Sequence, residues 1–309
     1  MAASVPGPDL HHAAVHHRRR GRGADLRRGT RGGARGLIPP RGWAGRPRPA
    51  APSSPPSAKS SEAHHMSVLF VTGTGTEIGK TVTTAAVAAA TLRRGRSVAV
   101  LKAAQTGLTV DEPGDAAEAG RLAGAVTVCE LARFPEPLAP ATAALRAGLP
   151  PVRPQEIAEA AAKLAASHDL VLVEGAGGLL VRFDDEGNTL ADAARMAGAP
   201  VLVVVQAGLG TLNATALTSL ALRSHGLDCT GVVVGSWPAE PDLAARCNLG
   251  DLPQAADAPL LGLIPEGSGT LPPDAFQAAA PGWLAPELGG SGAFGPADLA
   301  ALAPAALAS

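Results

Sequence analysis

The residues best suited to chemistry form a glycine-rich segment that contains a lysine and a threonine. Residues 73–81 read GTGTEIGKT, between an apolar run at 67–72 and an alanine-rich helical pattern. A loop in this position turns its backbone N–H groups toward phosphate oxygens, and the start of the helix adds positive potential. Lys80 is placed to hold the β- and γ-phosphates, and Thr81 is placed to bind Mg²⁺ through its hydroxyl. Five residues separate the first and last glycines, whereas the usual pattern has four, so this is a variant phosphate-binding loop.

A carboxylate and a second lysine stand where strands are expected to end. Glu174 ends an apolar run and precedes Gly175-Ala-Gly-Gly178. A carboxylate at a strand end beside a phosphate loop is suited to binding Mg²⁺, directly or through water. The glycines allow the backbone to approach a phosphate or a substrate closely. Lys102 ends another apolar run, where a lysine either neutralises charge on a transferred phosphoryl group or lies on the surface.

Asp115 is a further candidate, at the start of a helical stretch that reads GDAAE. Taken alone, an aspartate in this position is typical of helix capping rather than of metal binding. Asp111, Glu112 and Glu118 are nearby competitors for either role.

Short apolar runs that alternate with helical patterns must position these residues. Strands are expected at 67–72, 97–102, 169–174, 200–206, 229–235 and 259–264, and helices near 80–94, 154–167, 189–197 and 211–225. Continuous runs of β-branched residues such as VLVVV indicate strands buried on both faces. The pattern predicts an α/β fold in which a doubly wound, mostly parallel sheet is flanked by helices, with ligands beyond the carboxyl ends of the strands.

Composition excludes several classes of protein. Of the 309 residues, 46% are hydrophobic, so a sizeable core can be buried. Residues 67–309 hold 14 basic and 24 acidic residues, a balance that argues against a general nucleic-acid surface. No apolar run is long enough to span a membrane. The three cysteines show no metal-binding or disulfide spacing, which fits a reducing cytoplasm.

The two ends of the chain differ from the rest. Residues 1–66 are rich in Arg, Gly and Pro and hold 12 basic and three acidic residues, so we expect a disordered extension. Three interpretations of this extension compete: a basic arm for nucleic acid, a targeting peptide, and upstream sequence wrongly joined to a start at Met66. We favour the last. Residues 67–284 are expected to form the P-loop domain, and residues 285–309 a flexible Gly/Ala-rich tail.

Together these segments resemble dethiobiotin synthetase. The resemblance covers about residues 67–270 and includes VTGTGTEIGKT (71–81), KAAQTG (102–107), GDAA (114–117), PLAPATAA (137–144), VEGAGGLL (173–180), GLGTLNAT (208–215) and LLGLIPEG (260–267). It implies a ligase that converts 7,8-diaminopelargonate, CO₂ or bicarbonate, and ATP into dethiobiotin, ADP and phosphate in biotin synthesis. It also implies a homodimer with Mg²⁺ as cofactor, and the cysteine pattern predicts a cytoplasmic location.

The resemblance also assigns roles to residues. Lys80 and Lys102 are the catalytic residues that it implies, and Thr81, Asp115 and Glu174 are its metal ligands. It places the nucleotide against Glu77, Ile78, Gly79, Lys80, Thr81, Val82, Asp115, Glu174, Gly175, Ala176, Gly177, Gly235, Ser236, Pro265, Glu266 and Gly267. It places the substrate against Thr106 and, at the carboxylate tail that reaches the partner subunit, against Gly210, Thr211 and Asn213. Many members have Asn-Asp in place of Gly235-Ser236, so nucleoside triphosphates other than ATP stay open as substrates.

Two other classes of protein share this fold. Partition-type switch ATPases resemble one another in a KGGxGKT loop. This chain has Gly75 at the position of the first lysine of that loop. An amidotransferase-type synthase that acts on a cobalamin precursor needs a further glutaminase domain, for which the chain has no room. The ligase is therefore the favoured interpretation, and the switch ATPase is the alternative.

Overall fold

A computed structural model describes residues 67–295, and residues 1–66 and 296–309 lie outside the described part. A parallel sheet of seven strands, in the order β4-β2-β6-β1-β7-β8-β9, runs through its centre. The strands are β1 (Val68–Gly73), β2 (Val98–Lys102), β4 (Thr127–Glu130), β6 (Leu170–Glu174), β7 (Val201–Val205), β8 (Cys229–Trp237) and β9 (Leu260–Pro265). Two short strands, β3 (Gln105–Thr106) and β5 (Arg133–Phe134), pair beside the sheet.

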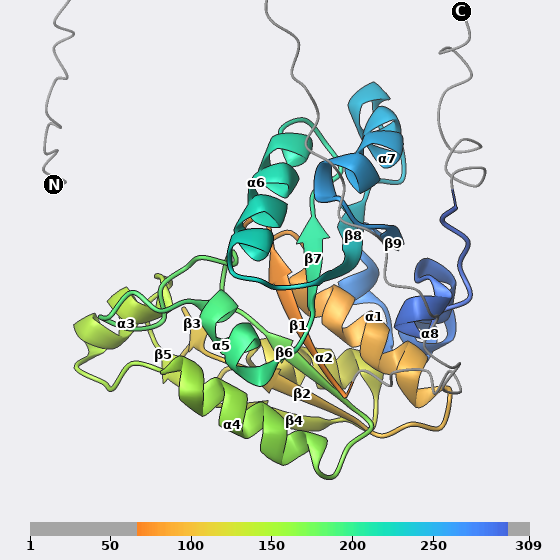
Figure 1. The fold of residues 1–309 in the computed structure, drawn as a ribbon. Helices are drawn as coiled ribbons and strands as arrows, with labels where there is room; N and C mark the ends of the chain where they lie inside the picture. Colours follow the sequence, from red (N-terminus) through yellow and green to blue (C-terminus); the bar gives the residue numbers. More distant parts are fainter. Residues whose placement is uncertain (1–66, 296–309) are drawn as a thin grey trace, which may run out of the picture. The chain divides into compact units, whose positions relative to one another are not determined.

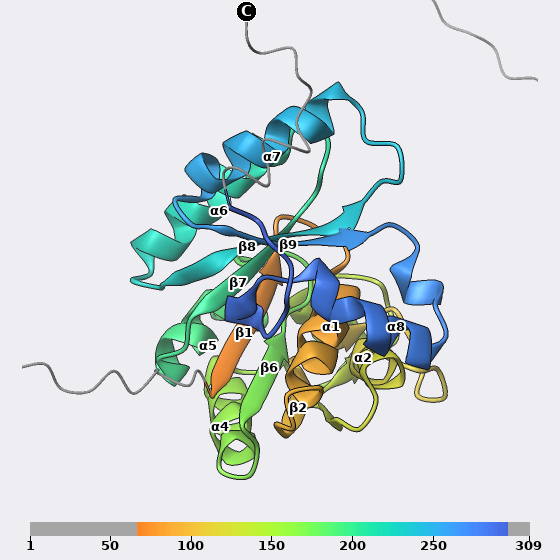
Figure 2. The ribbon, with the colours of Figure 1, turned by 90° about the vertical axis from the view of Figure 1, so that its right-hand side faces the viewer.

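Helices cover both faces of the sheet (Figures 1 and 2). They are α1 (Lys80–Leu92), α2 (Asp115–Ala123), α3 (Pro140–Ala147), α4 (Pro154–Ala165), α5 (Leu190–Ala197), α6 (Thr211–Ser224), α7 (Leu243–Ala256) and α8 (Pro273–Ala279), with 3₁₀ turns η1 (Ser268–Thr270), η2 (Ala280–Trp283) and η3 (Pro286–Leu288). Figure 2 shows α1, α2 and α8 on one side and α4 to α7 on the other. No helix in the described part is long and apolar enough to cross a membrane.

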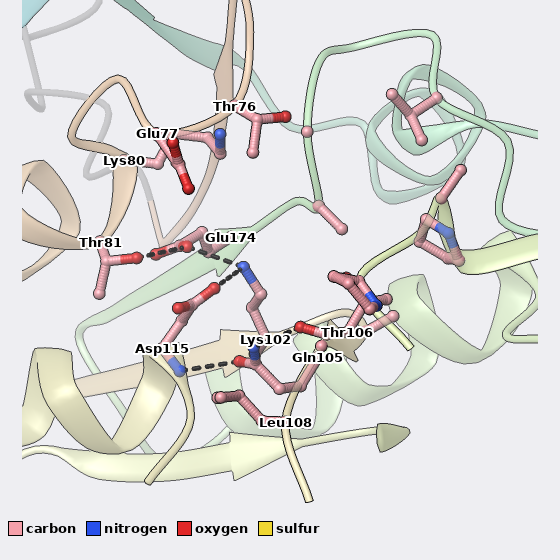
Figure 3. Close-up of a pocket in the computed structure, with 18 of the residues that line it drawn as sticks. Thr76, Glu77, Lys80, Thr81, Lys102, Gln105, Thr106, Leu108, Asp115 and Glu174 are labelled. Atoms are coloured by element: carbon pink, nitrogen blue, oxygen red, sulfur yellow. Dashed lines mark hydrogen bonds and ion pairs between the residues drawn. The ribbon is translucent and has the colours of Figure 1, made fainter. Parts of the chain in front are cut away.

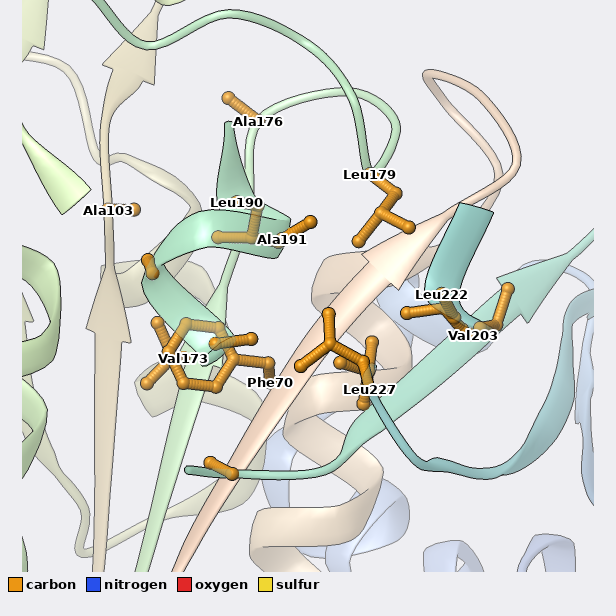
Figure 4. Packing of buried hydrophobic residues seen from close by; sticks show 14 of the residues in the cluster. Phe70, Ala103, Val173, Ala176, Leu179, Leu190, Ala191, Val203, Leu222 and Leu227 are labelled. Atoms are coloured by element: carbon orange, nitrogen blue, oxygen red, sulfur yellow. The ribbon is translucent and has the colours of Figure 1, made fainter. Parts of the chain in front are cut away.

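Two apolar cores lie between the sheet and these layers. One joins α1, α2 and α8 to the sheet around Leu69, Leu122 and Phe276. The other joins α3 to α7 to the opposite face around Phe70 and Leu190, and Figure 4 shows part of it. Because both faces are covered, every residue of Val201–Val205 is buried. This explains the continuous apolar runs in the sequence and confirms the expected α/β class.

The order of the strands determines where a ligand can bind. From β1 the chain crosses to β2 and β4 on one side, returns to β6, and then builds β7, β8 and β9 on the other side. The crossovers diverge at the carboxyl ends of β1 and β6, and in doubly wound sheets a ligand crevice opens at such a point.

Several elements depart from the expected pattern. The expected strands and helices are all present, but the strands β3, β4 and β5 and the helices α3, α7 and α8 were not predicted. Strand β4 lies at the sheet edge with two of its four residues exposed, and α7 contains Gly250 and Pro253, so neither shows a clear periodicity. Residues 285–295 were assigned to a flexible tail, yet the structure packs them on the domain. Leu288 is 3% exposed, and the Ala285 N–H donates to the Leu261 carbonyl at 2.8 Å.

Candidate functional site

A cavity of about 700 Å³ opens at the carboxyl ends of β1, β2 and β6 (Figure 3). Its walls come from the loop before α1, the end of β2 with β3, the start of α2, the loop before α3 and the loop after β6. Twelve of the residues predicted from the sequence line it: Glu77, Ile78, Gly79, Lys80, Thr81, Val82, Lys102, Thr106, Asp115, Glu174, Ala176 and Gly177. The chain therefore brings distant motifs together in one place.

The loop between β1 and α1 has the backbone of a phosphate cradle. Glu77 and Gly79 have positive φ angles of 57° and 90°, which turn the chain into the helix. The Lys80 ammonium donates to the Gly75 carbonyl at 2.8 Å, so the lysine folds back over its own loop. Burial and the nearby charge of Lys102 lower the pKa of Lys80, although Glu174 and Asp115 partly offset this. An anion such as a phosphate would relieve this cost.

Lys102 is a buried cation between two carboxylates. Its Nζ lies 2.5 Å from Asp115 Oδ2 and 2.9 Å from Glu174 Oε1, and it donates to the Gly175 carbonyl at 3.0 Å. Burial opposes the charge of Lys102, but the two carboxylates outweigh burial, so the pKa of Lys102 is raised above its ordinary value. The site therefore keeps a positive charge in a place from which water is largely excluded.

Glu174 has one oxygen atom in use and one free. Its Oε1 accepts from the Thr81 hydroxyl at 2.9 Å as well as from Lys102. Its Oε2 is buried without a hydrogen-bond partner, and the residue is 1% exposed. A buried carboxylate oxygen without a partner is costly unless a cation or a donor meets it.

These residues fit Mg²⁺ together with a nucleotide, but not Mg²⁺ alone. Among residues 67–295 no group of three or more His, Cys, Asp or Glu side chains could hold a metal. In protein sites Mg²⁺ commonly takes one or two carboxylates, with water and substrate phosphates completing its coordination. Thr81, Asp115 and the free oxygen of Glu174 match such a partial ligand set.

Other predicted residues lie outside the cavity wall. Gly235 packs under the phosphate loop, where a Cβ on it would lie 2.0 Å from the Ile78 carbonyl oxygen. Ser236 follows it and is exposed. Pro265, Glu266 and Gly267 lie at the end of β9, and the Glu266 N–H donates to the Trp237 carbonyl at 2.8 Å, which joins this turn to the end of β8. A Cβ at the next glycine, Gly269, would lie 3.2 Å from Val82 Cγ2, so this turn flanks the cavity on the side of helix α1.

Gly210, Thr211 and Asn213 form the start of α6 and do not line the cavity. Thr211 is buried with its hydroxyl unpaired, whereas Asn213 is exposed.

The structure also adds residues that were not singled out from the sequence. Gln105 and the turn Pro137–Pro140 line the cavity. Both lie inside motifs that carry the family resemblance, KAAQTG and PLAPATAA. That resemblance was the sequence feature from which they could have been predicted.

The parallel sheet, the phosphate loop and the cluster of lysines and carboxylates define a P-loop nucleotide-binding protein of the α/β class. A family model described as an AAA domain matches residues 67–273. The chain is 71% identical to the ATP-dependent dethiobiotin synthetase BioD of Streptomyces avermitilis over 226 residues, which are 73% of this chain and 95% of that protein. It is 67% identical to the BioD protein of Saccharopolyspora erythraea over 225 residues, 73% of this chain and 98% of that protein. The chain belongs to the dethiobiotin synthetase family.

The solved structure of the Pyrococcus furiosus cell division ATPase MinD aligns with 70% of this chain and 97% of its own, at a TM-score of 0.44 and 22% identity.

Proposed function

We propose that this chain is an ATP- and Mg²⁺-dependent cyclo-ligase that forms dethiobiotin from 7,8-diaminopelargonate and CO₂ in biotin synthesis. One substrate amine adds to CO₂ and forms a carbamate. A carbamate oxygen then takes the γ-phosphoryl group, and ADP leaves. The second amine attacks the carbonyl carbon of this mixed anhydride, which closes the ureido ring and expels phosphate.

The observation that carries this proposal is the buried Lys102 at the edge of a phosphate-binding loop. A phosphoryl transfer from ATP to a carbamate brings together two anionic groups, and a fixed cation between them lowers the barrier. Lys102 would take that position, a role supported by its place in the cavity wall with Thr106 and by its hydrogen bond to Glu174. Its pKa is raised, so it stays protonated at neutral pH.

Other residues would position the nucleotide. The backbone N–H groups of the loop and Lys80 hold the β- and γ-phosphates. Thr81, Asp115 and Glu174 would hold Mg²⁺, which neutralises phosphate charge when bound. Thr106 would contact the diamine, and Gly177 in the cavity wall would let the backbone approach the phosphates closely. Gly175 lies outside the cavity wall, and a Cβ on it would lie 2.5 Å from Leu190 Cδ2.

The base of the nucleotide would lie between the end of β8 and the turn after β9. No amide side chain stands at Gly235 or Ser236 to pair with adenine. Recognition of the base then depends on backbone groups near Pro265 to Gly267, so CTP or GTP would also serve.

A homodimer is part of the same proposal. Leu217 and Leu220 lie one turn apart on α6 and are 58% and 56% exposed, and Leu209 before the helix is 87% exposed. A partner on this face would cover them and would receive a substrate tail at Gly210, Thr211 and Asn213. Light scattering after size-exclusion chromatography should give the mass of a dimer, and Leu217→Glu should give a monomer. A wild-type monomer would contradict this part of the proposal.

The experiment that tests the function is phosphate release by the full chain with ATP and Mg²⁺. Release is expected to require both 7,8-diaminopelargonate and bicarbonate. Release at the same rate without the diamine would reject the ligase and would favour a switch ATPase.

The location would be cytoplasmic, in keeping with the free thiols of Cys129, Cys229 and Cys247.

A further inference from the structure

Gln105 is a buried amide in the cavity wall that the mechanism above leaves without a role. It is 4% exposed and lies in β3, three residues after Lys102. Its Oε1 accepts a hydrogen bond from the Asp115 backbone N–H at 2.8 Å, and its Nε2 donates to the Thr106 carbonyl at 3.2 Å (Figure 3). The uncharged side chain of Gln105 therefore links Asp115, which contacts Lys102, to Thr106, which is assigned to the substrate.

Helix α2 needs this hydrogen bond because it has no cap of its own. The residue before it, Gly114, has no side chain, and the first N–H groups of a helix have no partner within the helix. Gln105 supplies an acceptor from outside the helix, and it does so at Asp115, the first helical residue. A Cβ at Gly114 would lie 2.9 Å from Gln105 Oε1, so the glycine leaves room for this contact.

The segment between Gln105 and α2 is held from its other side by Arg133. The guanidinium of Arg133 pairs with both carboxylate oxygens of Glu130, at 2.7 and 2.8 Å. Its Nη1 donates to the carbonyls of Thr109 and Glu112, each at 2.6 Å. The loop before α2 is thus fixed in its middle by Arg133, and its end is fixed by Gln105.

The Asp115 side chain has few other constraints on its position. It is 36% exposed, whereas that of Glu174 is 1% exposed. Within residues 67–295 the Asp115 carboxylate forms a single ion pair, to Lys102 at 2.5 Å. A phosphate in the cavity would compete for Lys102, and a metal there would compete for Asp115. The backbone of Asp115 must therefore be held independently for the carboxylate to stay at the site.

We infer that Gln105 is a positioning residue that holds Asp115 at the metal side of the site through Oε1 and fixes Thr106 at the substrate side through Nε2. The inference rests on the proposed function, which assigns Asp115 to the metal and Thr106 to the substrate. Residues that orient metal ligands typically change metal affinity or activity by about 10- to 100-fold when they are replaced.

Two substitutions separate the two hydrogen bonds. Gln105→Met has a similar shape and makes neither bond, whereas Gln105→Glu keeps an acceptor for the Asp115 N–H and loses the donor to Thr106. Gln277→Met is the matched control, because Gln277 on α8 donates to the Leu122 carbonyl at 3.3 Å, near the other end of α2. The full-length chain is used for all of them.

The first readout is binding of a non-hydrolysable ATP analogue, measured by calorimetry over a range of Mg²⁺ concentrations without diamine. Gln105→Met should need about tenfold more Mg²⁺ for half-maximal binding enhancement. Gln105→Glu and Gln277→Met should resemble the wild type. The second readout is the KM for the diamine, which should rise in both Gln105 variants and stay unchanged in Gln277→Met.

If Gln105→Met needs no more Mg²⁺ than the wild type, the inference is overturned. It is also overturned if Gln105→Glu needs as much additional Mg²⁺ as Gln105→Met. If Gln105→Met does not fold, Gln105→Glu alone decides, because a wild-type KM for the diamine in that variant contradicts the role at Thr106. Failure of the proposed function is distinguishable, since the wild type would then bind the analogue with Mg²⁺ yet release no diamine-dependent phosphate.

Discussion

Lys102 stays charged inside the protein because Glu174 and Asp115 lie against it. Removal of a buried charge from a pair leaves its partner uncompensated, which is destabilising. The same arrangement prepares the site for anions, because phosphate or carbamate oxygens can meet a cation that is already fixed. Stability and chemistry at this residue are therefore linked, and a variant must be tested for both.

Lys102→Ala should leave a folded protein that turns over slowly. We expect kcat to fall by about 100-fold or more, as for the loss of one group that stabilises developing charge. Calorimetry should still detect ATP binding, because the backbone groups of the loop remain. Lys163→Ala, an exposed lysine on α4, is the control and should behave as the wild type. Near-normal turnover in Lys102→Ala would refute its catalytic role.

The affinity for the nucleotide should depend on pH through Lys80. Burial lowers the pKa of Lys80 from its ordinary value of 10.5, and bound phosphates would raise it again. Binding then takes up protons between these two pKa values. Affinity is greatest below the lowered pKa and falls as the pH rises through it.

Calorimetry in buffers of different ionisation enthalpy measures this proton uptake. Lys80→Arg provides the comparison, because arginine stays charged over the whole range and should show no such uptake. Affinity that is constant up to pH 10.5 in the wild type would contradict the lowered pKa.

At the scale of elements, the end of β8 supports the phosphate loop. A Cβ at Gly79 would lie 2.1 Å from the Gly235 carbonyl oxygen, and a Cβ at Gly235 would lie 2.5 Å from Val204 Cγ1. The two backbones are in direct contact, so the strand fixes the position of the loop. This gives Gly235 a structural reason to be glycine that is separate from reading the base.

Gly235→Ala should therefore displace the loop. We expect a lower melting temperature and weaker nucleotide binding, since overpacking in a tight site commonly costs about 1–3 kcal/mol. Gly250→Ala is the matched control, because nothing lies within 4 Å of a Cβ there and the residue is in helix α7. That variant should be as stable as the wild type or slightly more stable. Equal behaviour of the two variants would show that the contact does not hold the loop.

At the scale of the whole molecule, the sequence predicts the buried strands of the sheet better than the exposed edge strand β4. Runs such as Val201–Val205 are apolar throughout because both faces are covered. Thr127–Glu130 is an edge strand with exposed residues, so its pattern does not distinguish it from a loop. Residues 285–295 are rich in Gly and Ala, and only the fold shows that Leu288 is buried in the same core as α1, α2 and α8.

The site was predictable where a motif places residues on consecutive positions. Lys80, Thr81 and Glu174 follow from strand ends and a glycine-rich loop. The approach of Asp115 to Lys102 does not follow from a motif, because only the folded chain brings Gln105 to the Asp115 N–H and the Asp115 carboxylate to Lys102. The substrate residues at the start of α6 stay a prediction, since they lie outside the cavity of their own subunit.

The cavity lining that the structure describes lies between Thr76 and Val181, and the relatives match about 226 residues of this chain. A chain that starts at Met66 should therefore keep the turnover and the melting temperature of the full chain. Scanning calorimetry and phosphate release, run on both proteins in parallel, measure the two quantities. A loss of turnover in the shorter chain would assign residues 1–65 a role in activity.

The most direct test of the central claim is to identify the product. The full chain is incubated with 7,8-diaminopelargonate, ¹³C-bicarbonate and Mg²⁺, with ATP, CTP or GTP in separate reactions, and the products are analysed by mass spectrometry. We predict dethiobiotin with the label in its ureido carbon, one phosphate released for each molecule formed, and turnover with more than one of the nucleotides. Phosphate released without labelled dethiobiotin would contradict the account.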